Sequence, residues 1–276
     1  MTALPLGVGA AADIGRRSHM EDRWAVQTTP GGLFAAVYDG HGGSHVADRA
    51  AADLHLAVLR ALRAGLDATD ALRQAFDELE AATADPDCGS TVAALLLTGE
   101  GLVTAHLGDS RIVRVGKAGS EGLTRDHRID VADERARVLR MGAELDPPYV
   151  VRGDRGLMMT RSLGDRWFRP VGVIPEPEVG RHALGTDDVA LVAATDGVWD
   201  VLSVEDAARV VRRAATAQAG ADALIAAALA AGAHDNVTAL VVRLADLDRA
   251  ASRGEPSDDP REVVRDTRPP HRSADS

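Results

Sequence analysis

Six short runs of apolar residues, each four to six residues long and rich in valine, isoleucine and leucine, recur along the chain and constrain its fold most strongly. Apolar runs of this length are typical of strands that are buried on both faces. We therefore expect a core built from short strands. The runs cover residues 33–38, 92–97, 102–107, 112–115, 189–194 and 237–242.

Two pairs of segments between these runs carry apolar residues at helical spacing. The first pair covers residues 46–62 and 71–79, and the second covers 204–215 and 221–231. Ser203 stands where an N-cap is expected, because acidic residues follow it in the first turn. Clustered strands with paired helices favour an α+β fold, a four-layer α-β-β-α sandwich of two packed antiparallel sheets flanked by helix pairs.

Two further segments differ in character from the rest of the chain. Residues of about 130–160 hold a short helical pattern at 133–141 and then an irregular stretch with prolines and glycines, which we interpret as a flap subdomain beside a site. From about residue 252 the chain is polar and rich in charge and proline. We expect one folded domain over residues 1–250 and a disordered tail over 251–276.

Composition narrows the classes of partner and compartment. With 42 acidic against 31 basic residues and a net charge of −11, the chain lacks the positive charge that binds nucleic acid. Cys88 is the only cysteine, which fits a reducing compartment, the cytoplasm by default. No signal peptide or convincing membrane span is evident, so no membrane partner is expected. Lys117 is the only lysine, and this arginine bias suggests a bacterial source of high G+C content.

Acidic residues stand where apolar runs end. Asp39-Gly40 follows the first run, Asp109 lies two residues beyond the third, and Asp196-Gly197 follows the fifth closely. Strands that share a sheet can bring such ends together. Asp-Gly is also typical of hairpin turns, but both pairs here lead toward helical patterns rather than a second strand.

Convergence of these carboxylates would require a cation. Asp22, Asp39, Asp196 and Asp235 are the candidates, although Glu21-Asp22 alone fits a solvated loop and Asp235 alone fits a turn. Two charges ~4 Å apart repel by about 4 kcal/mol at an effective dielectric constant of about 20. Oxygen ligands select Mg²⁺ or Mn²⁺. Two such ions ~3.5 to 4 Å apart could activate a water and clamp a phosphoryl group.

A histidine and an arginine accompany the acidic residues. His41, next to Asp39-Gly40, titrates near neutrality and could protonate a leaving alkoxide. His41 and His45 could instead form a zinc pair, but the glycines between them disfavour a helix and no third histidine or cysteine is close in sequence. Arg17 could bind a phosphate dianion, although a lone arginine is also typical of a surface.

Residues 7–245 resemble the metal-dependent serine/threonine protein phosphatases of type 2C, also called PPM phosphatases. No single motif is specific, but their ordered series is. The matching motifs are Gly15-Arg16-Arg17-Ser18-His19-Met20-Glu21-Asp22, Tyr38-Asp39-Gly40-His41-Gly42-Gly43, Gly89-Ser90-Thr91, Gly108-Asp109-Ser110-Arg111, Leu123-Thr124-Arg125-Asp126-His127, Thr160-Arg161-Ser162-Leu163-Gly164-Asp165, Pro175-Glu176-Pro177-Glu178, Thr195-Asp196-Gly197-Val198-Trp199-Asp200 and Asp235-Asn236.

This resemblance implies a role for each site residue. It implies hydrolysis of phosphoserine and phosphothreonine in proteins by a hydroxide that bridges two Mn²⁺ or Mg²⁺ ions, with a third ion as an addition. The implied assignments are Asp22, Asp39, Asp196, Asp235 and the Gly40 carbonyl for the two ions, Glu21 through metal-bound water, Arg17 for the substrate phosphate, His41 as general acid, Asp109 with Asp196 for the third ion, and Asp200 through water.

The resemblance also sets expectations for partners. We expect phosphorylated proteins as substrates, an opposing serine/threonine kinase, and a monomer. Every expected ligand position is filled, which favours an active enzyme. The alternatives are a phosphoprotein-binding scaffold of weak activity and a phosphatase or phosphodiesterase of small molecules. Residues 145–159 depart from the commoner flap pattern, so the substrate preference stays open.

Overall fold

Two antiparallel sheets form the centre of the protein. The computed structural model describes residues 7–29, 31–83, 85, 87–246 and 263–265. One sheet has the order β1 (Val8–Asp13), β16 (Val237–Arg243), β15 (Asp188–Ala194), β8 (Arg111–Gly116) and β9 (Ser120–Gly122). The other has the order β14 (Glu178–His182), β7 (Gly101–Leu107), β6 (Val92–Thr98), β3 (Gly32–Tyr38), β2 (Arg23–Thr29) and β17 (Val263–Arg265).

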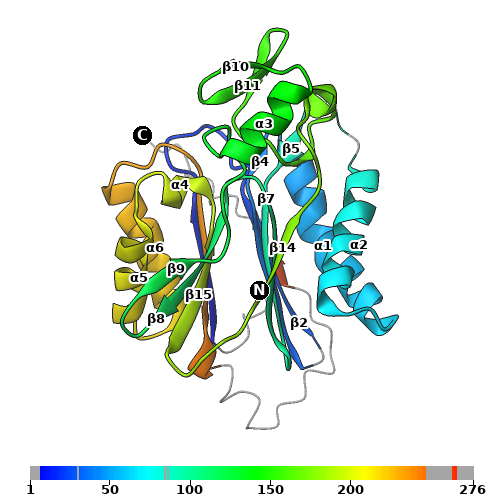
Figure 1. Ribbon diagram of the computed structural model, residues 1–276. Helices are drawn as coiled ribbons and strands as arrows, with labels where there is room; N and C mark the ends of the chain where they lie inside the picture. The colour runs from blue at the N-terminus through cyan, green and yellow to red at the C-terminus, as the bar shows by residue number, and fades with distance from the viewer. Residues whose placement is uncertain (1–6, 30, 84, 86, 247–262, 266–276) are drawn as a thin grey trace, which may run out of the picture.

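A pair of helices covers the outer face of each sheet (Figure 1). Helices α1 (His45–Arg63) and α2 (Ala68–Ala82) lie beside the six-stranded sheet, and α5 (Val204–Arg213) and α6 (Ala217–Ala230) beside the five-stranded one. The Ser203 hydroxyl accepts a hydrogen bond from the Asp206 N–H, as expected of an N-cap. The predicted α+β sandwich of four layers is confirmed.

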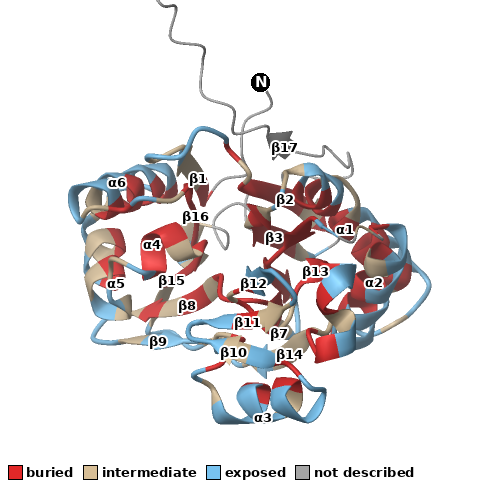
Figure 2. Cartoon of the chain, turned by 90° about the horizontal axis from the view of Figure 1, so that it is seen from above, coloured by how far each residue is buried: buried red, intermediate tan, exposed pale blue. Residues whose placement is uncertain are grey.

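The strands are buried on both faces because they lie between a sheet and a helix pair. In β3, Ala35 and Val37 pack between the two sheets, whereas Phe34 and Tyr38 pack toward α1 and α2. This alternation follows from the two-residue period of a strand. Figure 2 shows the central strands buried and the outer helix faces exposed. Because both faces of these strands are buried, their sequences are continuous apolar runs.

A small subdomain caps one end of the sandwich (Figure 1). It contains α3 (Ala132–Arg140) and a sheet of β10 (Glu144–Asp146), β11 (Tyr149–Arg152) and β12 (Arg155–Leu157). We expected an irregular stretch after the helix, but it forms this three-stranded sheet. Its turns lie at Pro147-Pro148 and at Gly153, whose φ of 65° suits glycine.

Other short elements complete the described chain. They are α4 (Asp196–Trp199), a 3₁₀ helix η1 (Arg166–Val171), and a small sheet of β13 (Leu163–Gly164), β5 (Gly89–Ser90) and β4 (Gly40–His41). The expected domain end near residue 250 lies within residues 247–262, outside the described residues. The predicted disordered tail also lies outside them, apart from β17, which pairs with β2. Among the described residues, no helix combines the length and apolar character needed to cross a membrane.

Candidate metal centre

Four aspartates come together at the end of the sandwich that the subdomain caps. Asp39 joins β3 to β4, and Asp22 directly precedes β2, the neighbour of β3. Asp196 begins α4 just after β15, and Asp235 lies just before β16, the neighbour of β15. Each sheet thus contributes two carboxylates, and the strand ends that the sequence singled out are brought together.

Burial and mutual repulsion dominate the electrostatics of this cluster. Burial, together with the charges of Asp196 and Asp22, raises the pKa of Asp39 well above its usual range. Burial also raises the pKa of Asp22 to about 7, and burial and the charge of Asp109 raise that of Asp196 well above its usual range. Such a cluster is stable only with protons or cations among its oxygens.

The donor set fits a hard divalent cation. One carboxylate oxygen each from Asp39, Asp109 and Asp196 lie within 4.8 Å of one another. Oδ1 of Asp109 and Oδ1 of Asp196 are buried, and neither has a hydrogen-bond partner among the described residues. Buried carboxylate oxygens without donors, in a cluster of oxygen ligands only, suit Mg²⁺ or Mn²⁺ better than softer metals.

Neighbouring groups fix the orientation of the carboxylates. The Thr195 hydroxyl donates to Asp22 Oδ2 at 2.8 Å, and the Asp39 N–H donates to Thr91 Oγ1 at 3.2 Å. A Cβ at Gly40 would lie only 2.7 Å from the Glu21 carbonyl oxygen. Glycine at position 40 therefore lets the segment that carries Glu21 approach β4 closely.

A cleft of about 740 Å³ opens above the aspartates. Asp39, Asp196 and Asp235 line it on one side, and the capping subdomain contributes a second wall. Arg17 also lines the cleft, and its guanidinium contacts Asp235 Oδ2 at 2.6 Å. The second wall contains Tyr149, Arg155, Gly156, Leu157, Met158 and Met159.

His41 lies in the same cleft and pairs with Asp165. Its Nε2 is 2.7 Å from Asp165 Oδ2. Burial acts to lower the pKa of His41, but the Asp165 carboxylate outweighs burial and the pKa is raised. The ring is therefore held toward its protonated form, as a group that donates a proton must be.

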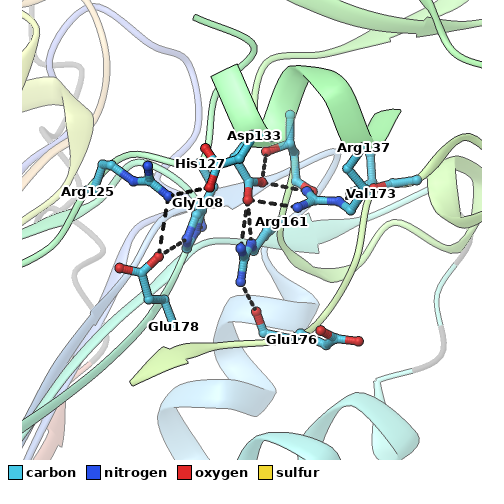
Figure 3. Close-up of polar contacts among 12 residues, drawn as sticks. Gly108, Arg125, His127, Asp133, Arg137, Arg161, Val173, Glu176 and Glu178 are labelled. Carbon is cyan, nitrogen blue, oxygen red and sulfur yellow. Dashed lines mark hydrogen bonds and ion pairs between the residues drawn. The ribbon is translucent and has the colours of Figure 1, made fainter. Parts of the chain in front are cut away.

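The contacts of the histidines in the described residues do not favour a zinc site. His45 Nε2 lies 2.7 Å from Asp85 Oδ2, so His41 and His45 contact different aspartates. A second cluster combines His106, His127 and Glu178, of which His127 and Glu178 are labelled in Figure 3. The two rings are stacked with centroids 4.4 Å apart, and His106 Nε2 is already committed to the Arg125 carbonyl at 2.8 Å. Stacked rings direct their nitrogen lone pairs in parallel planes, which suits a shared metal ion poorly.

A buried ion-pair network ties the capping subdomain to the sandwich. Glu134 of α3 is fully buried and accepts hydrogen bonds from Arg137, Arg161 and the Thr160 hydroxyl. Figure 3 shows the two arginines converging at this point. Burial acts to raise the pKa of Glu134, but these donors outweigh it and hold the pKa well below its usual range. The network places the second wall of the cleft relative to the aspartates.

The position predicted for a third ion contains an arginine. Asp109 and Asp200 lie near Asp196. Arg128 Nε lies 2.6 Å from Asp109 Oδ2, and its Nη2 lies 3.4 Å from Asp196 Oδ2 and 3.4 Å from Asp200 Oδ1. Binding of a third ion stays a prediction.

Sequence reasoning assigned no role to several residues at this site. Asp165 and Thr91 stand in motifs that were recognised, but the motifs do not say what their side chains contact. Arg128 directly follows one such motif, and Arg155 lies in the segment that departs from the family pattern. For Asp165 and Thr91, their place in a family motif was the only sequence signal that could have marked them as site residues.

Comparisons with known proteins agree with this geometry. A sequence model of the family described as "Protein phosphatase 2C" matches residues 14–237. Two similar Arabidopsis thaliana proteins are "Probable protein phosphatase 2C 59", 31% identical over 85% of this chain and 78% of that protein, and "Probable protein phosphatase 2C 69", 32% identical over 88% and 72%.

Two solved structures share the fold. A C. elegans sex-determining protein superposes with a TM-score of 0.75 at 24% identity, over 88% of this chain and 66% of that one. The serine-threonine phosphatase 2C from Toxoplasma gondii superposes with a TM-score of 0.72 at 24% identity, over 88% and 96%.

Proposed function

The chain belongs to the protein phosphatase 2C family of metal-dependent serine/threonine protein phosphatases, and we propose that the aspartate cluster is the metal centre of this activity. The protein is accordingly a hydrolase that acts on phosphoserine and phosphothreonine in proteins. The observation that carries the proposal is the convergence of Asp22, Asp39, Asp196 and Asp235 beneath a cleft that Arg17 and His41 also line.

We assign two Mn²⁺ or Mg²⁺ ions to this centre. The Asp22, Asp39, Asp196 and Asp235 carboxylates, with the Gly40 carbonyl, would hold them, and Glu21 would act through water. Bound ions of this kind lower the pKa of a water and neutralise charge on a phosphoryl group. The buried Oδ1 of Asp196, which accepts no hydrogen bond from the described residues, supports this assignment.

The remaining residues would bind the substrate and move a proton. Arg17 has a side chain that is 60% exposed, so its guanidinium can reach a phosphate dianion at the cleft. Asp165 holds the His41 ring in place and favours its protonated form. His41 would then supply the proton that the serine or threonine oxygen needs as it leaves.

The proposal extends to the opposing enzyme, the oligomeric state, the source and the cellular compartment. We propose an opposing serine/threonine kinase, a monomeric enzyme, and a bacterial source, the last from the arginine bias. Cys88 is buried and free, which suits action in the reducing cytoplasm.

Phosphate release from a phosphothreonine peptide tests the function. We expect turnover with Mn²⁺, loss of turnover with a chelator, and a large loss in Asp196→Asn. Asp53→Asn, the same change at a partly exposed position of α1 that pairs with Arg49, serves as the control and should retain turnover. Hydrolysis of a phosphodiester or a sugar phosphate, but not of the peptide, would contradict the proposal, as would folded protein that binds Mn²⁺ without turnover.

A further inference from the structure

The geometry points to a role for Arg128 that a metal ion would otherwise fill. We propose that the Arg128 guanidinium takes the place of a third metal ion, so that the centre of this chain binds two ions. The inference rests on the proposed function, because it concerns carboxylates of the same centre.

The contacts of Arg128 are those expected of a third ion. Its guanidinium touches Asp109, Asp196 and Asp200, the three carboxylates that the family resemblance assigns to that ion. The contact with Asp109 is the closest, at 2.6 Å, and the Asp109 side chain is fully buried. The Arg128 side chain thus contacts one carboxylate oxygen of each of these three aspartates.

The surroundings hold Arg128 in this position. Its backbone forms a bridge to Met159 of the second cleft wall, and its side chain is only 19% exposed. The neighbouring Arg111 binds Asp126 through two hydrogen bonds, at 2.6 and 2.7 Å. Asp126 is therefore engaged elsewhere and does not draw Arg128 away from the three carboxylates.

The chemistry of arginine makes this replacement effective. A guanidinium is charged at every physiological pH, and its planar array of donors binds several carboxylate oxygens at once. A divalent cation placed among the same oxygens would lose those ligand atoms and face a like charge. Oδ1 of Asp109 and Oδ1 of Asp196 accept no hydrogen bond from any described residue. Of these two residues, Asp196 belongs to the two-ion centre, so Arg128 leaves its Oδ1 for that centre while it holds Oδ2.

Counting bound ions tests the proposal without relying on activity. Parent protein, Arg128→Gln and Arg114→Gln would be dialysed to equilibrium against saturating Mn²⁺, and bound metal per chain would be measured by elemental analysis. We expect two ions in the parent, three in Arg128→Gln, and two in Arg114→Gln, which loses an arginine of β8 that pairs with Glu121 and Asp188 outside the centre. Arg128→Lys, which keeps a positive charge, should also bind two.

Thermal unfolding supplies a second readout. Loss of Arg128 leaves the buried Asp109 without its counter-ion, so Mn²⁺ should raise the Tm of Arg128→Gln more than that of the parent. Three ions in the parent, or two in folded Arg128→Gln with a parental Tm shift, would overturn the inference. The parent count also tests it if Arg128→Gln does not fold. Fewer than two ions in the parent would contradict the proposed metal centre instead.

Discussion

His41 can be separated experimentally from the metal centre because it lies in the cleft but pairs with Asp165. We predict that His41→Asn lowers kcat on a phosphothreonine peptide by about 10²- to 10⁴-fold, the usual contribution of a general acid. A p-nitrophenolate leaves without a proton, so turnover of p-nitrophenyl phosphate should fall far less. Steady-state kinetics on both substrates measures the difference.

A matched histidine provides the control for this prediction. His45→Asn removes an exposed ring that pairs with Asp85, and it should leave both activities unchanged. Mn²⁺ binding should be the same in all three proteins. An equal loss of kcat on the two substrates in His41→Asn would show that the ring serves something other than proton donation.

Among the proposed ligands, Asp39 and Asp196 could be singled out from local sequence, whereas Asp22 and Asp235 depended on the family resemblance. The side chains that contact these ligands and His41 could not be predicted. Asp39 and Asp196 could be identified because each follows an apolar run, and a strand end is visible in a single sequence. Asp165 contacts His41 across 124 positions of sequence, and Arg128 reaches Asp196 across 68. Contacts of this kind depend on how distant segments pack, which local patterns do not specify.

Glu134 links the capping subdomain to the sandwich, and its ionisation should tune the stability of that link. Breaking a buried ion pair typically costs about 3 to 5 kcal/mol, so Glu134→Gln should lower the free energy of unfolding by about that amount at neutral pH. The exposed Glu144, on β10 of the same subdomain, provides the control variant Glu144→Gln, for which no comparable loss is expected.

The pH dependence of this loss has a definite sign. The folded pKa of Glu134 lies well below its ordinary value of 4.5, so the carboxylate stabilises the fold fully above that value and progressively less as pH falls below it. The stability difference between parent and Glu134→Gln should therefore shrink in acid. Urea unfolding at several pH values measures it, and a difference that grows as pH falls would contradict the assignment.

Elements with strong apolar patterns were predicted, and those without were missed. The runs that became β3, β6, β7, β8, β15 and β16 were evident, as were the two helix pairs. Strand β2 was not evident from the sequence, because it buries Arg23, Gln27 and Thr29 among its apolar residues. β1 consists largely of alanine and glycine, which have weak strand propensity, and only its pairing with β16 defines it.

The geometry of the whole site depends on the contact between the two sheets, because each sheet supplies two of the four clustered aspartates. Leu191 of β15 is fully buried between them. Leu191→Ala should lower the free energy of unfolding by about 2 to 5 kcal/mol because it leaves a cavity. Leu229→Ala, at a partly exposed position on α6, should cost far less in the same urea titration. Equal losses of unfolding free energy in the two variants would contradict the importance of packing between the sheets.

The net charge of −11 should affect the choice among phosphoproteins. An acidic molecule attracts basic substrates over long range, and salt screens this attraction. We predict a higher kcat/KM for a phosphothreonine peptide with basic flanks than for one with acidic flanks at low salt, with a ratio that falls toward one as salt is added. Equal kcat/KM values at low salt would contradict this prediction.

We expect hydrolysis to depend on metal ions that the aspartate cluster binds. The most direct measurement is a Mn²⁺ titration of parent and Asp39→Asn, followed in parallel by calorimetry and by phosphate release from a phosphothreonine peptide. Activity in the parent should rise with occupancy of the metal sites, and folded Asp39→Asn should lose both binding and turnover. Parental Mn²⁺ affinity and turnover in Asp39→Asn would contradict it.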